Sequence, residues 1–316
     1  MEKGEGVEFA KKNEVRVYPT LLYFDSKGDF IHRAAGALKA EAFIETGRNA
    51  LNPKERFVTF QRKFERGDSD KEFLLNFITK SQEASVPAEK PFNKYWALLS
   101  EDEKISEANL ILMQTITSGF SNMDHELFLF MNTNRAKYIK KLGTERFEPF
   151  WNQAYNSAVW YSAKEKKGSD SKAKMKKVKA IFTGKKNEVD AFYDMNVAWQ
   201  SRDDDKIKKA AAVYAEVTTD WQFLNGEAWA VYEKSDSKEE LEKALIWIRK
   251  SVEFNSNYMN LDTKGSILYK LKHYEKAIDA LEEAIEKADE TVPAASLNIT
   301  ETLLREIIME MQETDD

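Results

Sequence analysis

The chain has 316 residues, of which 42% are apolar and 12% aromatic, so it is long enough for about two domains with sizeable cores. Its formal net charge of −6 argues against a general nucleic-acid binder, and the absence of cysteine excludes disulfides, thiolate metal sites and thiol nucleophiles from this sequence. No run of about 18 apolar residues occurs, so we expect no membrane span, and the charged start MEKGEGVEF is not typical of a signal peptide.

The first elements predicted along the chain are a short helix and a β-hairpin. Residues 6–13 have an amphipathic pattern. Residues 20–24 and 30–36 are rich in apolar and β-favouring residues and flank the turn sequence DSKGD, which predicts two antiparallel strands. The positions of the helix that we expect to face inward are Val7, Phe9 and Ala10.

A second helix is predicted at residues 39–51, where Ala42, Phe43 and Ala50 fall on one face. The order helix, hairpin, helix, with VYPT before the first strand and Gly36 after the second, resembles the C-terminal half of the thioredoxin fold. The turn residues Asp25, Lys27 and Gly28 fit the same pattern.

This resemblance implies a cis peptide bond between Tyr18 and Pro19, and a loop whose backbone groups at Tyr18 and Thr20 hold an extended substrate. The alternative interpretation is an ordinary hairpin in which Pro19 only begins a strand. In the thioredoxin family this loop lies beside a Cys-X-X-Cys motif, which is absent here. Because dithiol exchange needs a thiolate that attacks a disulfide, we expect no such catalysis from this sequence and nominate no catalytic residue.

Only five residues precede the predicted helix at residue 6, whereas the family places strands and the redox motif before it. We therefore expect a chain that begins late relative to the thioredoxin fold, by truncation or a late start, rather than a naturally minimal domain. In the family the strand at 20–24 pairs with a central strand. Its outer edge should therefore be hydrophobic and be covered by the helical region or by a second copy of the chain.

Beyond residue 53 the pattern predicts helices only. Two helices broken at Gly67 and Asp68 carry phenylalanines on their inner faces (Phe57, Phe60, Phe64, Phe73 and Phe77), with Ser69 or Asp70 as the cap of the second. Between 145 and 164, apolar residues recur at helical spacing without interleaved basic residues, which favours a core stripe over a base-stacking surface. The other helices are predicted at 92–100, 104–118, 123–142, 172–182, 187–201 and 204–218.

The last third of the chain repeats itself. Residues 258–290 resemble a tetratricopeptide repeat, with Gly265 as the small residue of the first helix and Tyr274 at the turn. The usual Trp is Leu261 and the closing Pro is absent. The preceding segment looks like an earlier repeat, because Ala244, Ile248 and Ser251 precede three matching residues by 33 positions. The matching residues, expected on the buried face, are Ala277, Leu281 and Ala284.

Two repeats are fewer than the three or so needed for independent stability, so we expect them to dock on the upstream helices and to be capped by a helix at 295–312. Similar repeats bind partners on the concave side, which lies on the first helix of each repeat. The positions of the last repeat that this resemblance assigns to a binding groove are Met259, Asp262, Ser266 and Tyr269.

The predicted fold class is therefore mainly α: a partial thioredoxin-like α/β segment followed by an α-helical array similar to tetratricopeptide repeats. The expected division is residues 1–52, 53–218, 219–290 and a capping helix with tail at 291–316. This order resembles secreted bacterial thioredoxin-like proteins, which implies a periplasmic or secreted location. The sequence itself carries no localisation signal that we identify, and the cytoplasm is the alternative.

Few residues suggest other chemistry. The three histidines, His32, His125 and His273, are isolated from one another, so we predict neither a metal site nor a cofactor. The segment 164–179 has eight lysines but no arginine and no interleaved aromatic residue, which favours a solvated surface over an anion-binding one. The turn at 202–206, RDDDK, is interpreted as a helix cap rather than a cation site.

The resemblances lead to one preferred function and one alternative. The preferred function is a non-catalytic interaction protein whose partner is a protein or peptide client rather than a nucleic acid, with pairing of two copies through residues 20–24 as a further expected contact. The alternative is a part of a thiol–disulfide oxidoreductase whose Cys-X-X-Cys lies in an absent N-terminal segment.

Overall fold

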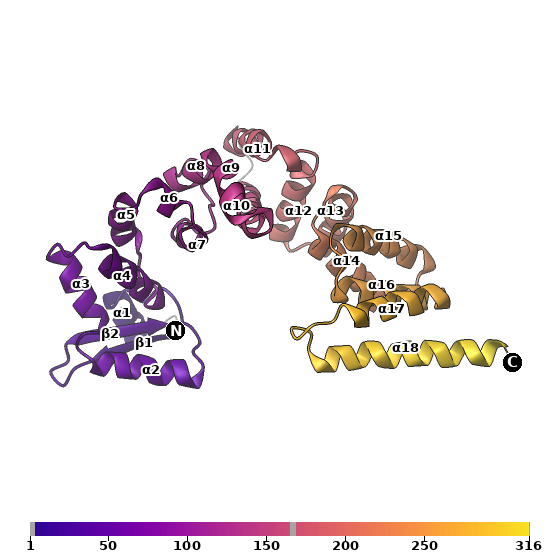
Figure 1. The fold of residues 1–316 in the computed structure, drawn as a ribbon, viewed down its shortest axis with the longest axis horizontal. Helices are drawn as coiled ribbons and strands as arrows, with labels where there is room; N and C mark the ends of the chain where they lie inside the picture. Colours follow the sequence, from indigo (N-terminus) through magenta and orange to yellow (C-terminus); the bar gives the residue numbers. More distant parts are fainter. Residues whose placement is uncertain (1–3, 165–168, 316) are drawn as a thin grey trace. The chain divides into compact units, whose positions relative to one another are not determined.

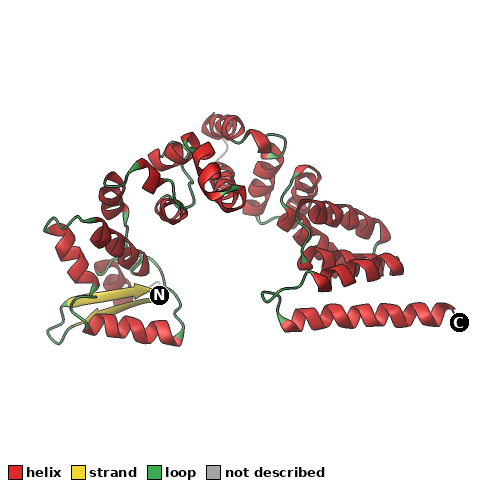
Figure 2. Ribbon diagram, viewed as in Figure 1, coloured by secondary structure: helices red, strands yellow, loops and turns green. Residues whose placement is uncertain are grey.

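The computed structural model describes residues 4–164 and 169–315. These residues form eighteen α-helices, one short 3-10 helix and one two-stranded antiparallel sheet, so the protein is mainly α, as predicted (Figures 1 and 2). The chain divides into two compact units, residues 1–158 and 159–316. The finer division predicted from the sequence stays a prediction.

The first unit contains the sheet and ten helices that begin in it. The strands are β1 (Thr20–Phe24) and β2 (Phe30–Ala35), and the helices are α1 (Glu5–Lys12), α2 (Ala40–Leu51), α3 (Phe57–Glu65), α4 (Lys71–Glu83), α5 (Glu89–Ala97), α6 (Glu101–Lys104), α7 (Glu107–Ile116), α8 (Glu126–Thr133), α9 (Arg135–Leu142) and α10 (Thr144–Lys164).

The hairpin forms where the sequence predicts it, because its turn is stabilised locally. The Asp25 carboxylate accepts hydrogen bonds from the backbone N–H groups of Lys27 and Asp29 at 2.9 and 3.0 Å, and these bonds hold the pKa of Asp25 below its ordinary value. Gly28 has a φ of 85°, a conformation that favours glycine. The ladder pairs Thr20 with Ala35 and is irregular only between Tyr23 and Phe24.

Helices α2, α3 and α4 pack against β2. On α2 the buried residues are Thr46 and Ala50, so of the three residues expected to face inward Ala50 is buried, whereas Ala42 and Phe43 are exposed. The prediction for α1 is wrong: Val7 and Phe9 are exposed and no residue of that helix is buried, although the Phe9 ring lies 6.2 Å from the Phe24 ring of β1.

The phenylalanines of α3 and α4 form the expected cluster. Phe57 and Phe77 are buried, and Phe60, Phe64 and Phe73 pack around them. Asp70, one of the two candidate caps, accepts a hydrogen bond from the Phe73 N–H at 2.9 Å. The stripe on α10 is also core, as predicted; its buried members include Phe147, Trp151, Ala154, Tyr155 and Ala158.

One predicted helix is interrupted. The pattern from 123 to 142 predicts a single helix, but Asn134, with φ and ψ of −99° and 13°, separates α8 from α9. The Asn134 side chain donates to the carbonyl oxygen of Phe130 at 3.0 Å. Asparagine competes in this way with the helical backbone ladder, so the apolar periodicity continues across a break that it does not reveal.

The second unit is built from helices alone in its described part. After α10 these are α11 (Ser169–Ile181), the 3-10 helix η1 (Thr183–Lys185), α12 (Val189–Ser201), α13 (Asp204–Val217), α14 (Trp221–Lys234), α15 (Lys238–Phe254), α16 (Tyr258–Lys270), α17 (Tyr274–Glu286) and α18 (Ala294–Asp315). Asp203 caps α13 through the N–H of Lys206, so the turn at 202–206 is a helix cap, as predicted.

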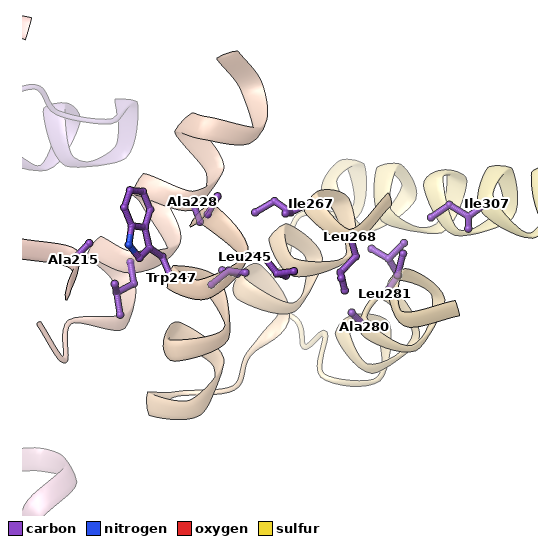
Figure 3. Packing of buried hydrophobic residues seen from close by; sticks show 13 residues of the cluster. Ala215, Ala228, Leu245, Trp247, Ile267, Leu268, Ala280, Leu281 and Ile307 are labelled. Atoms are coloured by element: carbon purple, nitrogen blue, oxygen red, sulfur yellow. The ribbon is translucent and has the colours of Figure 1, made fainter. Parts of the chain in front are cut away.

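Two successive helix pairs, α14 with α15 and α16 with α17, coincide with the two predicted repeats. All six residues that define the 33-residue offset are buried. A Cβ atom at Gly265 would lie 2.5 Å from Leu281 Cγ, so only glycine allows α16 and α17 to approach this closely. Figure 3 shows Leu281 with Ile267, Leu268 and Ile307 in the apolar cluster of this unit.

Ser251 connects the ends of three helices in this array. It is buried on α15, its hydroxyl donates to the carbonyl oxygen of Trp221 at 2.8 Å, and it accepts from Asn260 Nδ2 at 3.1 Å. Trp221 is the first residue of α14 and Asn260 lies in the first turn of α16. The polar atoms are thereby satisfied in a region that excludes water.

The helix α18 lies alongside α17 (Figure 1) and buries Ile307 in the apolar cluster, which agrees with the capping helix predicted at 295–312. Thr300 of α18 is 1% exposed, and its hydroxyl donates to Asp262 Oδ1 at 2.7 Å. The Tyr258 hydroxyl lies 2.7 Å from the same oxygen of Thr300. Polar contacts between α16 and α18 therefore add to the apolar packing.

Candidate functional site

The loop before β1 has the geometry that the resemblance implies. The Tyr18–Pro19 peptide bond is cis, and the carbonyl oxygen of Pro19 accepts a hydrogen bond from the Gly36 N–H at 2.9 Å. The Thr20 hydroxyl donates to the carbonyl oxygen of Val17 at 2.6 Å. The Tyr18 side chain is 58% exposed, so the loop presents an aromatic ring to solvent.

The outer edge of β1 has unpaired backbone groups. Because Pro19 and Gly36 form a hydrogen-bonded pair, and bonded and non-bonded pairs alternate in an antiparallel ladder, Thr20 and Leu22 belong to non-bonded pairs. Their N–H and C=O groups therefore point away from β2. In the part of the chain that the structure describes, no group outside the hairpin hydrogen-bonds to the backbone of either residue.

Cover of this edge by the helical region or by a second copy of the chain stays a prediction. Several apolar side chains near the edge are exposed. The rings of Phe9 and Phe24 are 6.2 Å apart, and both side chains, together with Val17 and Tyr18, are exposed. An unpaired strand edge with exposed apolar side chains is a surface suited to another extended chain.

A second feature of the first unit is an open cleft of about 750 Å³. It lies on the β2 side of the hairpin and is lined by the loop after α1, by β2 and by helices α3 to α5. We call it the Arg33 cleft; its lining residues include Arg33, Lys12, Arg16, Phe30, Phe64 and Phe77.

Arg33 is the most unusual side chain of this cleft, since it is charged and only 5% exposed. Its Nη1 and Nη2 atoms donate to the backbone carbonyl oxygens of Asn13 and Glu14 at 3.2 and 3.4 Å, while its Nε atom has no partner. Burial lowers the pKa of the guanidinium; Glu14 opposes this effect, and the nearby positive charge of Arg16 adds to it.

The groove positions predicted on α16 are divided between surface and interior. Met259 is 52% exposed, whereas Ser266 is 3% exposed and cannot form part of an open surface. Asp262 accepts from Thr300, and the Tyr269 hydroxyl donates to Glu310 Oε2 at 3.0 Å, so both side chains contact α18. Burial raises the pKa of Asp262. The binding role of these positions stays a prediction.

Two of the three histidines have local structural contacts. His32 is buried between β2 and α3, and His125 Nδ1 accepts from the Leu127 N–H at 3.2 Å at the start of α8. Within residues 4–164 and 169–315, no three His, Asp or Glu side chains are placed to hold a metal ion. The same residues include no helix with the length and apolar character needed to cross a membrane.

The lysine-rich segment 164–179 lies partly outside the described residues. Apart from Lys164, the last residue of α10, its described part belongs to α11, which buries Met175 and Val178 and exposes Lys172 and Lys176. This arrangement is typical of an amphipathic surface helix, in agreement with the solvated face that the sequence favours.

The structure brings Tyr18, Pro19 and Thr20 together in one loop at the start of the β1 edge, and it places the four groove positions on α16 in the other unit. Sequence reasoning did not identify Arg33 as a functional candidate. The available signal is the pair His32–Arg33 within the apolar strand sequence FIHRAAG, because a charged residue in a strand that is covered by helices needs a partner.

Comparison of the chain with protein-family models, with curated proteins and with solved structures gives no match.

Proposed function

We propose that this chain is an interaction protein that binds an extended protein or peptide segment along the outer edge of β1, next to Tyr18. The observation that carries the proposal is the pair of outward-facing backbone positions, Thr20 and Leu22, which no described group satisfies. An added strand would take up these donors and acceptors, and exposed side chains such as Tyr18 and Phe24 would contact its alternate residues.

The resemblance of the hairpin to the thioredoxin fold agrees with this proposal, since that family holds extended substrates at the same loop. The absence of cysteine makes binding, rather than dithiol exchange, the activity to test for this sequence. The helical array of the second unit would provide a scaffold, with Met259 as the exposed member of the predicted groove.

The experiment selects binding peptides from a random display library on the immobilised chain and follows amide hydrogen exchange with and without a selected peptide. We expect binding to slow exchange at the Thr20 and Leu22 amides. Leu22→Pro removes an outward donor that β2 does not use, so it should weaken binding about tenfold or more. Lys27→Gln, in the hairpin turn, is the matched control and should bind normally.

Self-pairing is distinguished by sedimentation of the chain alone. Protection of Thr20 and Leu22 that rises with chain concentration would identify a second copy as the occupant of the edge. Selected peptides that leave both amides unprotected, and that bind Leu22→Pro as well as the parent chain, would overturn the proposal.

A further inference from the structure

The Arg33 cleft is separate from the β1 edge, because it lies on β2 and the helices that pack there. We propose that this cleft binds a ligand with a single carboxylate carried on an apolar body. The carboxylate would lie against Arg33 and the apolar body against the phenylalanine side chains of β2, α3 and α4.

The need for an anion follows from the surroundings of Arg33. A buried guanidinium is normally paired with a carboxylate or phosphate, since removing an unpaired charge from water is costly. In the described residues no carboxylate pairs with Arg33, and its two hydrogen bonds go to neutral carbonyl oxygens. Its Nε atom remains without a partner although the side chain is 5% exposed and lines the cleft. A planar carboxylate matches the fork of donors that a guanidinium presents.

The apolar side chains that line the cleft favour a ligand with an apolar body. Phe30, Phe64 and Phe77 line it, and Val86 and Pro91 extend the apolar surface. A volume of about 750 Å³ is far larger than a simple inorganic anion needs and falls within the range of pockets for small organic ligands. A bare phosphate or sulfate would leave most of this apolar surface in contact with water.

The charged side chains of the cleft favour a ligand with a single negative charge. Besides Arg33, three cationic and three acidic side chains lie on the cleft: Lys12, Arg16, Lys90, Glu14, Glu65 and Glu89. The six cancel in formal charge, so the cleft has a net charge of +1 from Arg33 (four cationic minus three acidic). A polyanion would meet the three acidic groups, whereas one carboxylate balances the cleft.

Two sources share this chemistry: a free organic acid and the C-terminal carboxylate of a peptide that ends in an apolar residue. We would titrate the full chain calorimetrically with 4-phenylbutyrate for the first and with N-acetylphenylalanine for the second. The neutral isosteres 4-phenylbutyramide and N-acetylphenylalaninamide test the charge, and inorganic phosphate tests the apolar body. The tighter of the two acids assigns the source.

We expect at least one acid to bind about tenfold more tightly than its amide, because a charge-assisted pair with Arg33 is lost in the amide. Inorganic phosphate should bind more weakly than the better acid, and that acid should raise the thermal midpoint of the chain while the amide does not. Equal affinity of acid and amide, binding of phosphate as tight as that of the acids, or no binding of either acid at millimolar concentration would overturn the proposal.

Variants locate the site. Arg33→Gln should abolish the preference for acid over amide, and Arg33→Lys should restore part of it. If Arg33→Gln does not fold, as judged by circular dichroism, Arg16→Gln serves instead; Arg16 is exposed at the rim, and its loss should weaken acid binding several-fold without unfolding. Lys27→Gln is the control for a lost positive charge elsewhere on the hairpin. Acid binding that is unchanged in both arginine variants would place the ligand elsewhere and refute the proposal.

Discussion

The backbone N–H of Phe57, the first residue of α3, donates a hydrogen bond to Nδ1 of His32 on β2 at 3.0 Å. Since Nδ1 accepts, the proton of the neutral ring lies on Nε2, which is 3.3 Å from the Thr46 hydroxyl of α2. One buried imidazole therefore joins the hairpin to two helices. Burial lowers the pKa of His32 to about 4, and the positive charge of Lys80 contributes in the same direction.

This contact predicts acid sensitivity of the first unit. Protonation of His32 would remove the acceptor of the Phe57 N–H. The pKa is 6.5 for an ordinary histidine, the value taken for the unfolded chain, and about 4 for His32 in the folded protein. The contribution of the neutral ring to the free energy of unfolding is therefore complete above pH 6.5 and is lost as the pH falls toward 4. The loss is on the order of 3 kcal/mol. Amide exchange at Phe57, followed against pH, measures it.

The variant His32→Asn keeps an acceptor near the Nδ1 position but cannot be protonated in this range, so the acid-dependent loss should disappear. His273→Gln removes an exposed histidine of the second unit and should keep the loss. If the protection factor of the Phe57 amide, which corrects the exchange rate for its intrinsic dependence on pH, is the same in the parent chain at pH 7 and pH 4.5, the hydrogen bond does not depend on the neutral ring.

Gly265 predicts a packing effect in the helical array. Gly265→Ala places a methyl group 2.5 Å from Leu281 Cγ, so α16 and α17 must separate. We expect the free energy of unfolding to fall by about 1–3 kcal/mol, as in other overpacked cores. Gly226→Ala on α14 is the matched control, since nothing lies within 4 Å of its Cβ; it should stabilise by about 0.5–1 kcal/mol. Urea denaturation of both variants checks the contrast, and equal effects would contradict it.

Thr300 predicts how firmly α18 is attached. Thr300→Val conserves the shape but leaves the Asp262 carboxylate and the Tyr258 hydroxyl without the shared partner, which should cost about 1–3 kcal/mol. Hydrogen exchange along α18 should accelerate in this variant. Thr302→Val, two residues away and exposed, is the control and should change stability by less than about 0.5 kcal/mol.

The cap of α4 gives a fourth prediction. Asp70→Ala removes the acceptor of the Phe73 N–H and should lower the free energy of unfolding of the first unit by about 1 kcal/mol. Ser69→Ala is the adjacent control, because Ser69 is not the N-cap residue. A larger loss in Ser69→Ala than in Asp70→Ala would refute the assignment of the cap.

Local signals predicted much of the fold. The turn around Asp25 and Gly28 and the β-rich flanks defined both strands, and the 33-residue offset located the two helix pairs with the correct buried residues. These features depend on short-range chemistry or on a repeated pattern. The break at Asn134 was missed because the apolar spacing continues through it.

The inward faces of α1 and α2 could not be predicted, because periodicity identifies an apolar face but not whether another element covers it. Phe9 and Phe43 lie on such apolar faces and are nevertheless exposed. The candidate site was predicted in part: the loop at Pro19 came from a resemblance carried by a few residues. The Arg33 cleft depends on segments as distant in sequence as Lys12 and Pro91, whose proximity no local pattern encodes.

Ser251 has a consequence for how the array responds to mechanical force. Its hydroxyl is bonded to Trp221 within the α14–α15 pair and to Asn260 at the start of α16, so tension applied along the chain cannot separate one helix pair from the next without breaking the bond to Asn260. In a single-molecule pulling experiment we expect the two helix pairs to unfold together in a single event. In Ser251→Ala we expect that event to divide into two smaller steps.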